Sequence, residues 1–289
     1  MENLVSEQKD YLKKIPDGKL DVKIIAFDLD DTLLDNQCTV SDETVKSIRK
    51  CAERGIYIVL CSGRTERGIL PHVKRLDIAG TEAGRFIIAI NGASVFDLHK
   101  RLPLRTLGLD GKTLQEVHHF ASEYGFGCHV ADEDTIIADR DTVWTRKDSL
   151  LCNLNFRVEE DFDSYIAKGY PKMIIPGPVD QVNKVLPELR EKLKGKADVF
   201  TSKPFFIEVM PSGVGKGQSL LWLSNQLNIP RCKTMAFGDS FNDESMLRAV
   251  EYSVAMCNGQ DEIKELCRFV TRKTNNEDGI ADFLNSWVL

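Results

Sequence analysis

The stretch that decides the fold is VKIIAFDLDDT, residues 22–32. Its first half is a run of β-branched and aromatic residues, which is typical of a strand buried on both faces of a sheet. Its second half becomes abruptly acidic at Asp28 and Asp30. A second junction of this kind, TMAFGDSFND, occupies residues 234–243. We therefore expect two strands of one parallel sheet, each followed by carboxylates.

The position of these carboxylates predicts a metal site. In open α/β sheets the reactive crevice lies beyond the carboxyl ends of the strands. Carboxylates gathered there repel one another unless a hard cation lies between them, and an all-oxygen set of ligands suits Mg²⁺. The side chains that we expect to meet there are Asp28, Asp30, Asp239 and Asp243.

The chain around these junctions alternates strands and helices. Apolar runs at 56–61 and 86–90 predict two more buried strands. A helix is expected from Ser41, a favourable N-cap, and Gly55 is expected to end it in the left-handed region. This alternation predicts an α/β fold with a Rossmann-like, doubly wound parallel-sheet core.

The middle of the chain has a different character, because short strand-like pieces alternate there with amphipathic helices at 111–124 and 180–193. We interpret residues 93–209 as an inserted α+β cap domain with a sheet of its own. Residues 21–92 and 210–289 then form the core, and residues 1–20 are an N-terminal extension. The strand-like pieces of the insertion are 127–130, 135–138, 173–175 and 205–209.

Composition bounds the class of function. The chain has 289 residues, 42% hydrophobic and 28% charged, with a net charge of −6. A general nucleic-acid surface needs a basic face, so we expect no nucleic-acid partner. No apolar run reaches the length of a membrane helix and no signal peptide is visible, so we expect no membrane partner.

The eight cysteines show no zinc spacing and no C-x-x-C pair. Several lie inside apolar runs, which is typical of reduced core residues in a cytosolic protein. We expect a cytoplasmic protein that is a monomer or a weak homodimer.

Asp28 and Asp30 lie where the first predicted strand ends, so both can point into one crevice. A carboxylate beside Mg²⁺ can attack a phosphoryl group in line, and a second carboxylate can protonate the leaving oxygen. The same pattern occurs in hydrophilic turns with N-cap aspartates, so the pair alone leaves both interpretations open.

Two further positions suit phosphate binding. Ser62, after the next strand, offers a hydroxyl and the N–H groups of a Gly-containing turn. Lys216 follows a glycine-containing loop and opens a helix, where its ammonium can neutralise a phosphoryl group. Alone, the first is an ordinary turn and the second an ordinary surface lysine.

In combination and order, these motifs resemble the haloacid-dehalogenase (HAD) superfamily of aspartate-nucleophile phosphohydrolases. The motifs appear here as DLDDTLL at 28–34, Ser62, Lys216 and GDSFND at 238–243. The closer likeness is to the Cof-type (class IIB) phosphatases, whose cap is of the C2 type, between the second and third motifs. One departure is Asp31, where Gly is common in this subfamily.

The resemblance implies roles for these residues. Asp28 is implied as the nucleophile and Asp30 as the general acid/base, while Ser62 and Lys216 hold the phosphoryl group. Asn242 is implied to orient Lys216 or the phosphate. The implied substrate-binding residues are Gly63, Arg64, Asn91 and Asn242. The implied Mg²⁺ ligands are Asp28, the backbone carbonyl of Asp30, and Asp239. Asp243 is implied either as a further ligand or as a residue that supports the ligands.

The activity implied is that of a Mg²⁺-dependent phosphomonoesterase working through an aspartyl-phosphate intermediate. Small phosphorylated metabolites are its expected partners, with sugar phosphates as the leading class. Two alternatives stay open. One is a phosphosugar mutase on the same scaffold, and the other is a non-catalytic, sugar-phosphate-binding regulator.

Two features of the insertion carry separate expectations. The turn at 129–134 offers His129, Asp132, Glu133 and Asp134, and we hypothesise that it contacts a sugar. His118 and His119 are adjacent on a predicted helix, so we expect them to point in different directions and to form a poor metal pair.

Overall fold

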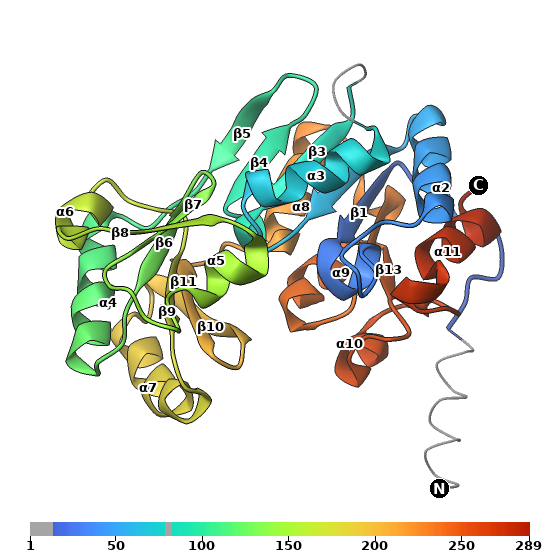
Figure 1. Cartoon of the computed structure of the whole chain (residues 1–289). Coiled ribbons are helices and arrows are strands. Elements are labelled where there is room, and N and C mark those ends of the chain that lie inside the picture. The colour runs from blue at the N-terminus through green and yellow to red at the C-terminus, as the bar shows by residue number, and fades with distance from the viewer. Residues whose placement is uncertain (1–13, 79–82) are drawn as a thin grey trace, which may run out of the picture. The chain divides into compact units, whose positions relative to one another are not determined.

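The computed structural model describes residues 14–78 and 83–289, and it forms two compact units (Figure 1). The first unit contains residues up to 63, 69–104 and 215–289, and the second contains 64–68 and 105–214. Each unit has one sheet and its own apolar core. Most of the predicted N-terminal extension, residues 1–13, lies outside the described residues.

The sheet of the first unit confirms the predicted parallel core. Strand β1 pairs in parallel with β2 on one side and with β12 on the other. The pairs β12–β13, β13–β14 and β2–β3 are also parallel, and β4 runs antiparallel to β3. In sheet order the strands are β14 (Phe269–Val270), β13 (Tyr252–Ala255), β12 (Thr234–Gly238), β1 (Ile24–Asp28), β2 (Tyr57–Cys61), β3 (Arg85–Ala89), β4 (Ser94–Asp97) and β5 (Leu102–Thr106).

The register of the central strands brings their carboxyl ends to one edge. Phe27 of β1 is paired with Phe237 of β12 and with Leu60 of β2. The rings of Phe27 and Phe237 stack with their centroids 5.3 Å apart. Every residue of β1 is buried, so this strand has no solvent-facing side until it ends at Asp28.

Helices cover both faces of this sheet, as a doubly wound fold requires. One face packs against α2 (Asp42–Glu53), α3 (Glu66–Leu76) and α11 (Gly279–Trp287). The other packs against α8 (Lys216–Gln226), α9 (Glu244–Ala249) and α10 (Asp261–Leu266). The predicted helix signals at α2 are confirmed, because the Ser41 side chain accepts from the N–H of Thr44 and Gly55 has φ +77°.

The second unit has a mixed sheet with helices α4 (Gly111–Glu123), α5 (Lys147–Cys152), α6 (Phe162–Ile166) and α7 (Val179–Lys192). Its core gathers the apolar sides of α4, α6 and α7 against one face of that sheet. In sheet order the strands are β10 (Ala197–Lys203), β11 (Phe206–Pro211), β9 (Met173–Pro176), β6 (His129–Asp132), β7 (Thr135–Ala138) and β8 (Asn155–Val158).

The structure and the sequence place the boundaries differently. The predicted cap begins at residue 93, but β4 and β5 extend the sheet of the first unit, and the second unit resumes only at Arg105. The predicted extension ends at residue 20, yet Lys14 already donates from Nζ to the carbonyl oxygens of Lys264 and Glu265, each at 2.9 Å. Among the described residues, no helix is long and apolar enough to cross a membrane.

Candidate active site

Asp28, the last residue of β1, lies at the carboxyl edge of the parallel sheet with 6% of its side chain exposed. It is paired with Cys61, which ends β2, and β12 ends at Gly238, one residue after Phe237, the partner of Phe27. The chain continues from Asp28 into a tight turn, Leu29–Leu33, instead of a regular helix. The buried strand therefore places the carboxylate of Asp28 at the edge of the sheet, where residues from later segments of the chain must provide its polar partners.

Lys216 supplies the first part of that environment. It opens α8 and is completely buried, and its Nζ donates to Asp28 Oδ1 at 2.5 Å and to Asp243 Oδ1 at 2.6 Å. A buried ammonium requires such partners, because transfer of an unpaired charge out of water is very unfavourable. Lys216 thus bridges two carboxylates that are far apart in the sequence.

Both carboxylate oxygens of Asp243 accept hydrogen bonds. Oδ1 accepts from Lys216, while Oδ2 accepts from the backbone N–H of Asp239 at 3.1 Å and of Ser240 at 3.3 Å. Asn242, by contrast, is exposed, and its Oδ1 accepts from the Ser240 hydroxyl at 2.6 Å. Asp243 is therefore a residue that orients Lys216, and the other role implied for Asn242, orientation of the phosphate, stays a prediction.

Asp239 completes the carboxylate cluster. It is 8% exposed, and its Oδ1 accepts from the Thr32 hydroxyl at 2.9 Å. One carboxylate oxygen from each of Asp28, Asp239 and Asp243 lies within 4.8 Å of the others. Three buried carboxylates therefore meet a single buried ammonium, and negative charge is in excess.

The excess charge shifts the acid–base properties of the site. Burial, together with the nearby Asp243, raises the pKa of Asp28 well above its ordinary value, against the opposing effect of Lys216. Burial and Asp243 also raise the pKa of Asp239, to about 7. Burial alone would lower the pKa of Lys216, but Asp243 and Asp28 outweigh it and raise that pKa.

The turn after β1 explains a departure noted in the sequence. Asp31 has φ +62°, in the left-handed region where Gly is favoured and Asp is tolerated. Its carbonyl oxygen accepts from Asn258 Nδ2 at 2.8 Å. Asp30 keeps an extended ψ of 127° inside the turn and is exposed. The predicted site thus contains one solvent-facing carboxylate next to three buried ones.

Ser62 is 1% exposed and follows β2 at the same edge of the sheet. Its own N–H donates to Ile88 and its carbonyl accepts from Asn91, each at 2.9 Å. The backbone N–H of Ser62 is therefore engaged within the protein and is not available to a phosphate. A Cβ added to Gly63 would lie 3.1 Å from Asn91 Oδ1, so these two predicted residues are neighbours.

The turn that contains Asn91 has a strained backbone and contacts the start of α8, the helix that carries Lys216. Ile90 and Asn91 have φ of 51° and 49°, and Gly92 has φ of 103°. A Cβ at Gly92 would lie 2.3 Å from the Gly215 carbonyl oxygen, so only glycine fits. The Ser219 hydroxyl donates to the Gly92 carbonyl at 2.6 Å. Ser219 was missed by the sequence analysis, since a helical serine carries no signal of such a role.

A comparison with profiles of known protein families identifies the family of this chain. A profile of the haloacid dehalogenase-like hydrolases matches residues 25–284, which include the whole carboxylate cluster. The chain belongs to the haloacid dehalogenase-like hydrolase family. The resemblance stated from the sequence motifs is thereby confirmed.

Similar proteins of known name agree with this assignment. A 5-amino-6-(5-phospho-D-ribitylamino)uracil phosphatase of Bacillus subtilis is 29% identical, over 93% of this chain and 97% of its own length. An HMP-PP phosphatase of Serratia proteamaculans is 26% identical, over 92% and 95%. A solved haloacid dehalogenase-like hydrolase of Bacteroides thetaiotaomicron superposes with a TM-score of 0.84 and 29% identity, over 91% and 98%. The prediction of an HAD-type phosphatase is confirmed.

The second unit answers the expectations about the insertion. The predicted hairpin exists, as β6 and β7, but His129 lies at the start of β6, 1% exposed and 3.2 Å from Asp148. Asp132 accepts from the hydroxyls of Tyr165 and Tyr170 and from Lys168 Nζ. Glu133 pairs with Arg67 at 3.1 Å, and Asp134 accepts from the Thr135 hydroxyl at 3.0 Å. Glu133 and Asp134 are exposed, unlike His129, and the sugar contact of this turn stays a prediction. Arg64 groups with this unit, and its role stays a prediction.

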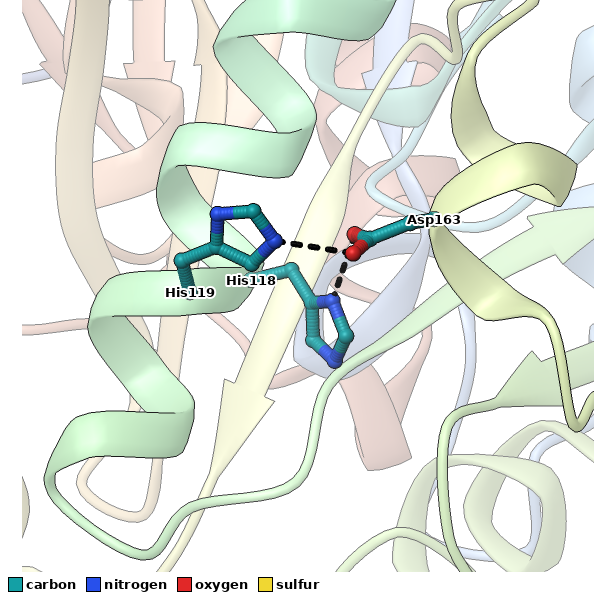
Figure 2. A group of neighbouring side chains, drawn as sticks. All are labelled: His118, His119 and Asp163. Atoms are coloured by element: carbon teal, nitrogen blue, oxygen red, sulfur yellow. Dashed lines mark hydrogen bonds and ion pairs between the residues drawn. The ribbon is translucent and has the colours of Figure 1, made fainter.

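The expectation that His118 and His119 diverge is wrong. Both imidazoles reach the same carboxylate, that of Asp163 in α6 (Figure 2). The two rings leave adjacent positions of α4, but one uses Nδ1 and the other Nε2, and this difference in reach compensates for the angle between them.

Proposed function

We propose that the protein is a Mg²⁺-dependent phosphomonoesterase that hydrolyses small phosphorylated metabolites through an aspartyl-phosphate on Asp28. The observation that carries the proposal is the buried bridge from Asp28 through Lys216 to Asp243, where β1 ends. A carboxylate that only stabilised the fold would need one partner. Asp28 instead shares its single ammonium with a second carboxylate and lies beside a third.

The residues present fit a magnesium ion. Asp28 and Asp239 offer buried oxygens within 4.8 Å of each other, and burial together with the nearby Asp243 raises the pKa of both. An all-oxygen donor set favours Mg²⁺ over softer metals. Asp28, Asp239 and the backbone carbonyl of Asp30 would hold the ion. When bound, the ion supplies positive charge that keeps Asp28 ionised and draws the phosphoryl group towards it.

In the first step, an oxygen of Asp28 attacks phosphorus in line with the leaving group. The Asp28 O–P bond forms, the bond from phosphorus to the leaving oxygen breaks, and Asp30 donates its proton to that oxygen. Asp30 suits this work because it is exposed, two residues from the nucleophile. Lys216 offsets the charge of the nucleophile and of the phosphoryl oxygens, and Asp243 fixes its position.

In the second step, Asp30, now ionised, accepts a proton from a water molecule that attacks the phosphorus. The Asp28 O–P bond breaks, phosphate is released, and both carboxylates return to their starting state. The Ser62 hydroxyl, with Gly63 and Asn91 beside it, provides donors for the phosphoryl oxygens at the same edge. The left-handed turn at Asn91 and Gly92 holds this side of the site against the start of α8.

Sugar phosphates are the substrate class that we favour. The name of the B. subtilis relative includes a phosphorylated ribityl chain, which is rich in hydroxyl groups like a sugar. We propose that the inserted segment, predicted as 93–209, acts as the cap that selects among such compounds. The eight cysteines form no disulfide, which agrees with a reducing compartment such as the cytoplasm.

A substrate panel tests the proposal. The full chain would be assayed for phosphate release from sugar phosphates, sugar-alcohol phosphates, nucleotides and acetyl phosphate, with Mg²⁺, with EDTA and with Ca²⁺. We expect Mg²⁺-dependent release, highest in kcat/KM for the hydroxyl-rich esters, no turnover in EDTA, and inhibition by Ca²⁺. Full activity in EDTA would refute the metal requirement. A rearranged phosphosugar without phosphate release would indicate the mutase.

A further inference from the structure

The second unit holds a cluster that the proposed phosphatase chemistry does not use. In it, His118 Nδ1 is 2.8 Å from Asp163 Oδ1, and His119 Nε2 is 2.8 Å from Asp163 Oδ2 (Figure 2). The histidines come from α4 and the carboxylate from α6, so the cluster connects two helices. One ligand atom from each residue lies within 4.8 Å of the other two.

A second carboxylate orients the inner histidine. The Nε2 of His118 is 3.4 Å from Asp139 Oδ2, and the side chain of Asp139 is only 5% exposed. The backbone N–H of Cys128 and the Nε of Arg140 donate to Asp139 and fix it. The ring of Phe162 packs edge-on against His118, with the centroids 5.0 Å apart. The imidazole is therefore held between Asp139 and Asp163.

The short distance between His118 and Asp163 requires either a proton or a metal ion between the two side chains. A neutral imidazole has a single N–H. If His118 donates that N–H to Asp139, its Nδ1 lone pair faces the oxygens of Asp163, and two acceptors then lie 2.8 Å apart. Either a second proton on His118 or a cation between the two acceptors relieves this conflict. A histidine whose far nitrogen is held by a carboxylate is the usual arrangement of a metal ligand.

We propose that His118, His119 and Asp163 bind one divalent transition-metal ion of the zinc class. Two imidazole nitrogens and one carboxylate oxygen suit borderline ions such as Zn²⁺ and Co²⁺, whereas Mg²⁺ and Ca²⁺ prefer oxygen alone. Ligand atoms of a tetrahedral zinc site lie about 3.3 Å apart for bonds of about 2.0–2.1 Å. The nitrogens therefore need to move only slightly away from Asp163 to admit the ion.

Exposure allows the ion to enter and leaves room for a fourth ligand. The side chains of His119 and Asp163 are 64% and 39% exposed, while that of His118 is 14% exposed. Water can complete the tetrahedron on the open side. The ion would add a bond between α4 and the five-residue α6, which already meet through apolar side chains in the core and through the hydrogen bonds to Asp163. The site is thus expected to stabilise the second unit and not to take part in phosphate transfer.

Protons compete with the ion for the same nitrogens. The hydrogen bond to Asp139 is the main cause that raises the pKa of His118, with a further contribution from Asp163. The charged groups around it are Asp139, Asp163, His119 and Arg140. Because a bound proton and a metal ion exclude each other at an imidazole nitrogen, metal affinity is expected to fall as pH falls.

Binding to the full-length protein tests the proposal without an activity assay. Co²⁺ would be titrated in excess Mg²⁺, which saturates the carboxylates of the first unit, under a phosphine reductant. Its visible d–d bands report a tetrahedral nitrogen–oxygen site, and a near-ultraviolet thiolate band would report cysteine ligands instead. Zn²⁺ would be titrated calorimetrically in parallel. The variants are His119→Ala, Asp163→Asn and Asp139→Asn, and the matched control is the exposed His99→Ala.

We expect one ion per chain for the wild type and for His99→Ala, with equal affinity. His119→Ala and Asp163→Asn should each weaken binding by more than about tenfold, and Asp139→Asn by about tenfold, since outer carboxylates contribute 10–100-fold. Zn²⁺ should raise the Tm of the wild type and leave that of His119→Ala unchanged. Equal affinity in wild type and His119→Ala, a thiolate band, no binding, or affinity independent of pH between 6 and 8 would each overturn the proposal.

Discussion

The two units both bury charged groups, but they balance the charge differently. In the second unit, the buried Lys172 pairs with Glu208 at 3.3 Å, and the imidazole of His129 lies 3.2 Å from Asp148. In the first unit, Lys216 bonds to the carboxylates of both Asp28 and Asp243, and that of Asp239 lies beside them. Three buried carboxylates therefore gather around the lysine of the first unit, whereas Lys172 of the second forms its ion pair with Glu208.

This difference distinguishes a buried ion pair that stabilises the fold from a cluster of charges that forms a binding site. A balanced buried pair satisfies its own hydrogen bonds and needs nothing from solution. An unbalanced cluster raises the pKa of its own carboxylates and destabilises the fold that holds it. The first unit tolerates that cost because a cation and a phosphorylated ligand can complete the site. The comparison predicts that changes in the two units will affect different measurements.

The largest expected effect is on turnover, through the unmatched cluster. Asp28→Asn keeps the shape of the side chain but removes the nucleophile, so kcat should fall by more than about 10⁴-fold. Thermal melting should show that the variant is folded. The matched control is Asp17→Asn, an exposed aspartate near the start of the same unit, and it should keep full activity. Substantial turnover by Asp28→Asn, with contamination excluded, would refute the aspartyl-phosphate mechanism.

Asp30→Asn should have the next largest effect. The amide cannot protonate the leaving oxygen or accept a proton from water, and both half-reactions should slow by about 10²–10⁴-fold. Stability should hardly change, since Asp30 is exposed. Rapid-quench measurements with a good leaving group, such as p-nitrophenol, should show phosphorylation slowed less than dephosphorylation, because that leaving group needs little acid. An equal loss in both steps would argue against this role.

Replacing each buried lysine by methionine compares the two units directly. Lys172→Met leaves Glu208 without its ammonium, and Lys216→Met leaves three carboxylates without theirs. Removal of one member of a buried pair costs about 3–5 kcal/mol, and we expect both metal-free variants to unfold at lower denaturant concentrations. Mg²⁺ should restore stability to Lys216→Met alone, because only the first unit can replace the lost cation by a metal. Equal rescue of both would contradict the comparison.

A smaller effect concerns pH. The pKa of Asp239 is raised from 3.8 to about 7, so its contribution to the stability of the metal-free protein is fully present below pH 4 and is lost as pH rises through 7. Mg²⁺ binds the ionised form, so its affinity should rise over the same range. Melting with and without Mg²⁺ should therefore show a larger increase in Tm at pH 8 than at pH 5.5. In Asp239→Asn the increase should be smaller and depend less on pH.

Most of the first unit could be predicted because its signals are local. A buried strand that ends in acid is visible in one segment of sequence, as at Asp28, and Lys216 follows a glycine-containing loop. The partner of Lys216 could not be predicted, since Asn242 and Asp243 share one short turn. Which of them points inward depends on tertiary packing: a Cβ at Gly238 would lie 2.6 Å from that of Asp243. Only glycine before Asp239 lets Asp243 enter.

The second unit was harder to predict because its elements are short and its contacts are long-range. The helix α6 has five residues and α5 has six, too few for a helical period to emerge. Without α6, nothing in the sequence brings Asp163 to His118 and His119. The predicted boundary at residue 93 differs from the division at Arg105 for a similar reason, since no strand was predicted at β4 or β5, which extend the first sheet.

The smallest expected effect is on substrate selectivity. In the hairpin turn of the second unit, we expect Asp132 to contribute to stability, and Glu133 and Asp134 to contribute to selectivity. Asp132 accepts hydrogen bonds from Tyr165, Tyr170 and Lys168, so Asp132→Ala should destabilise the protein by about 1–3 kcal/mol. Activity on every substrate should then change together.

Glu133 and Asp134 form the turn itself and are exposed. Replacing both by alanine should change the kcat/KM ratios among sugar phosphates a few-fold, yet leave the hydrolysis of acetyl phosphate unchanged. Equal losses on all substrates would assign the whole turn to structure, and unchanged ratios would place the selecting residues elsewhere in the inserted segment.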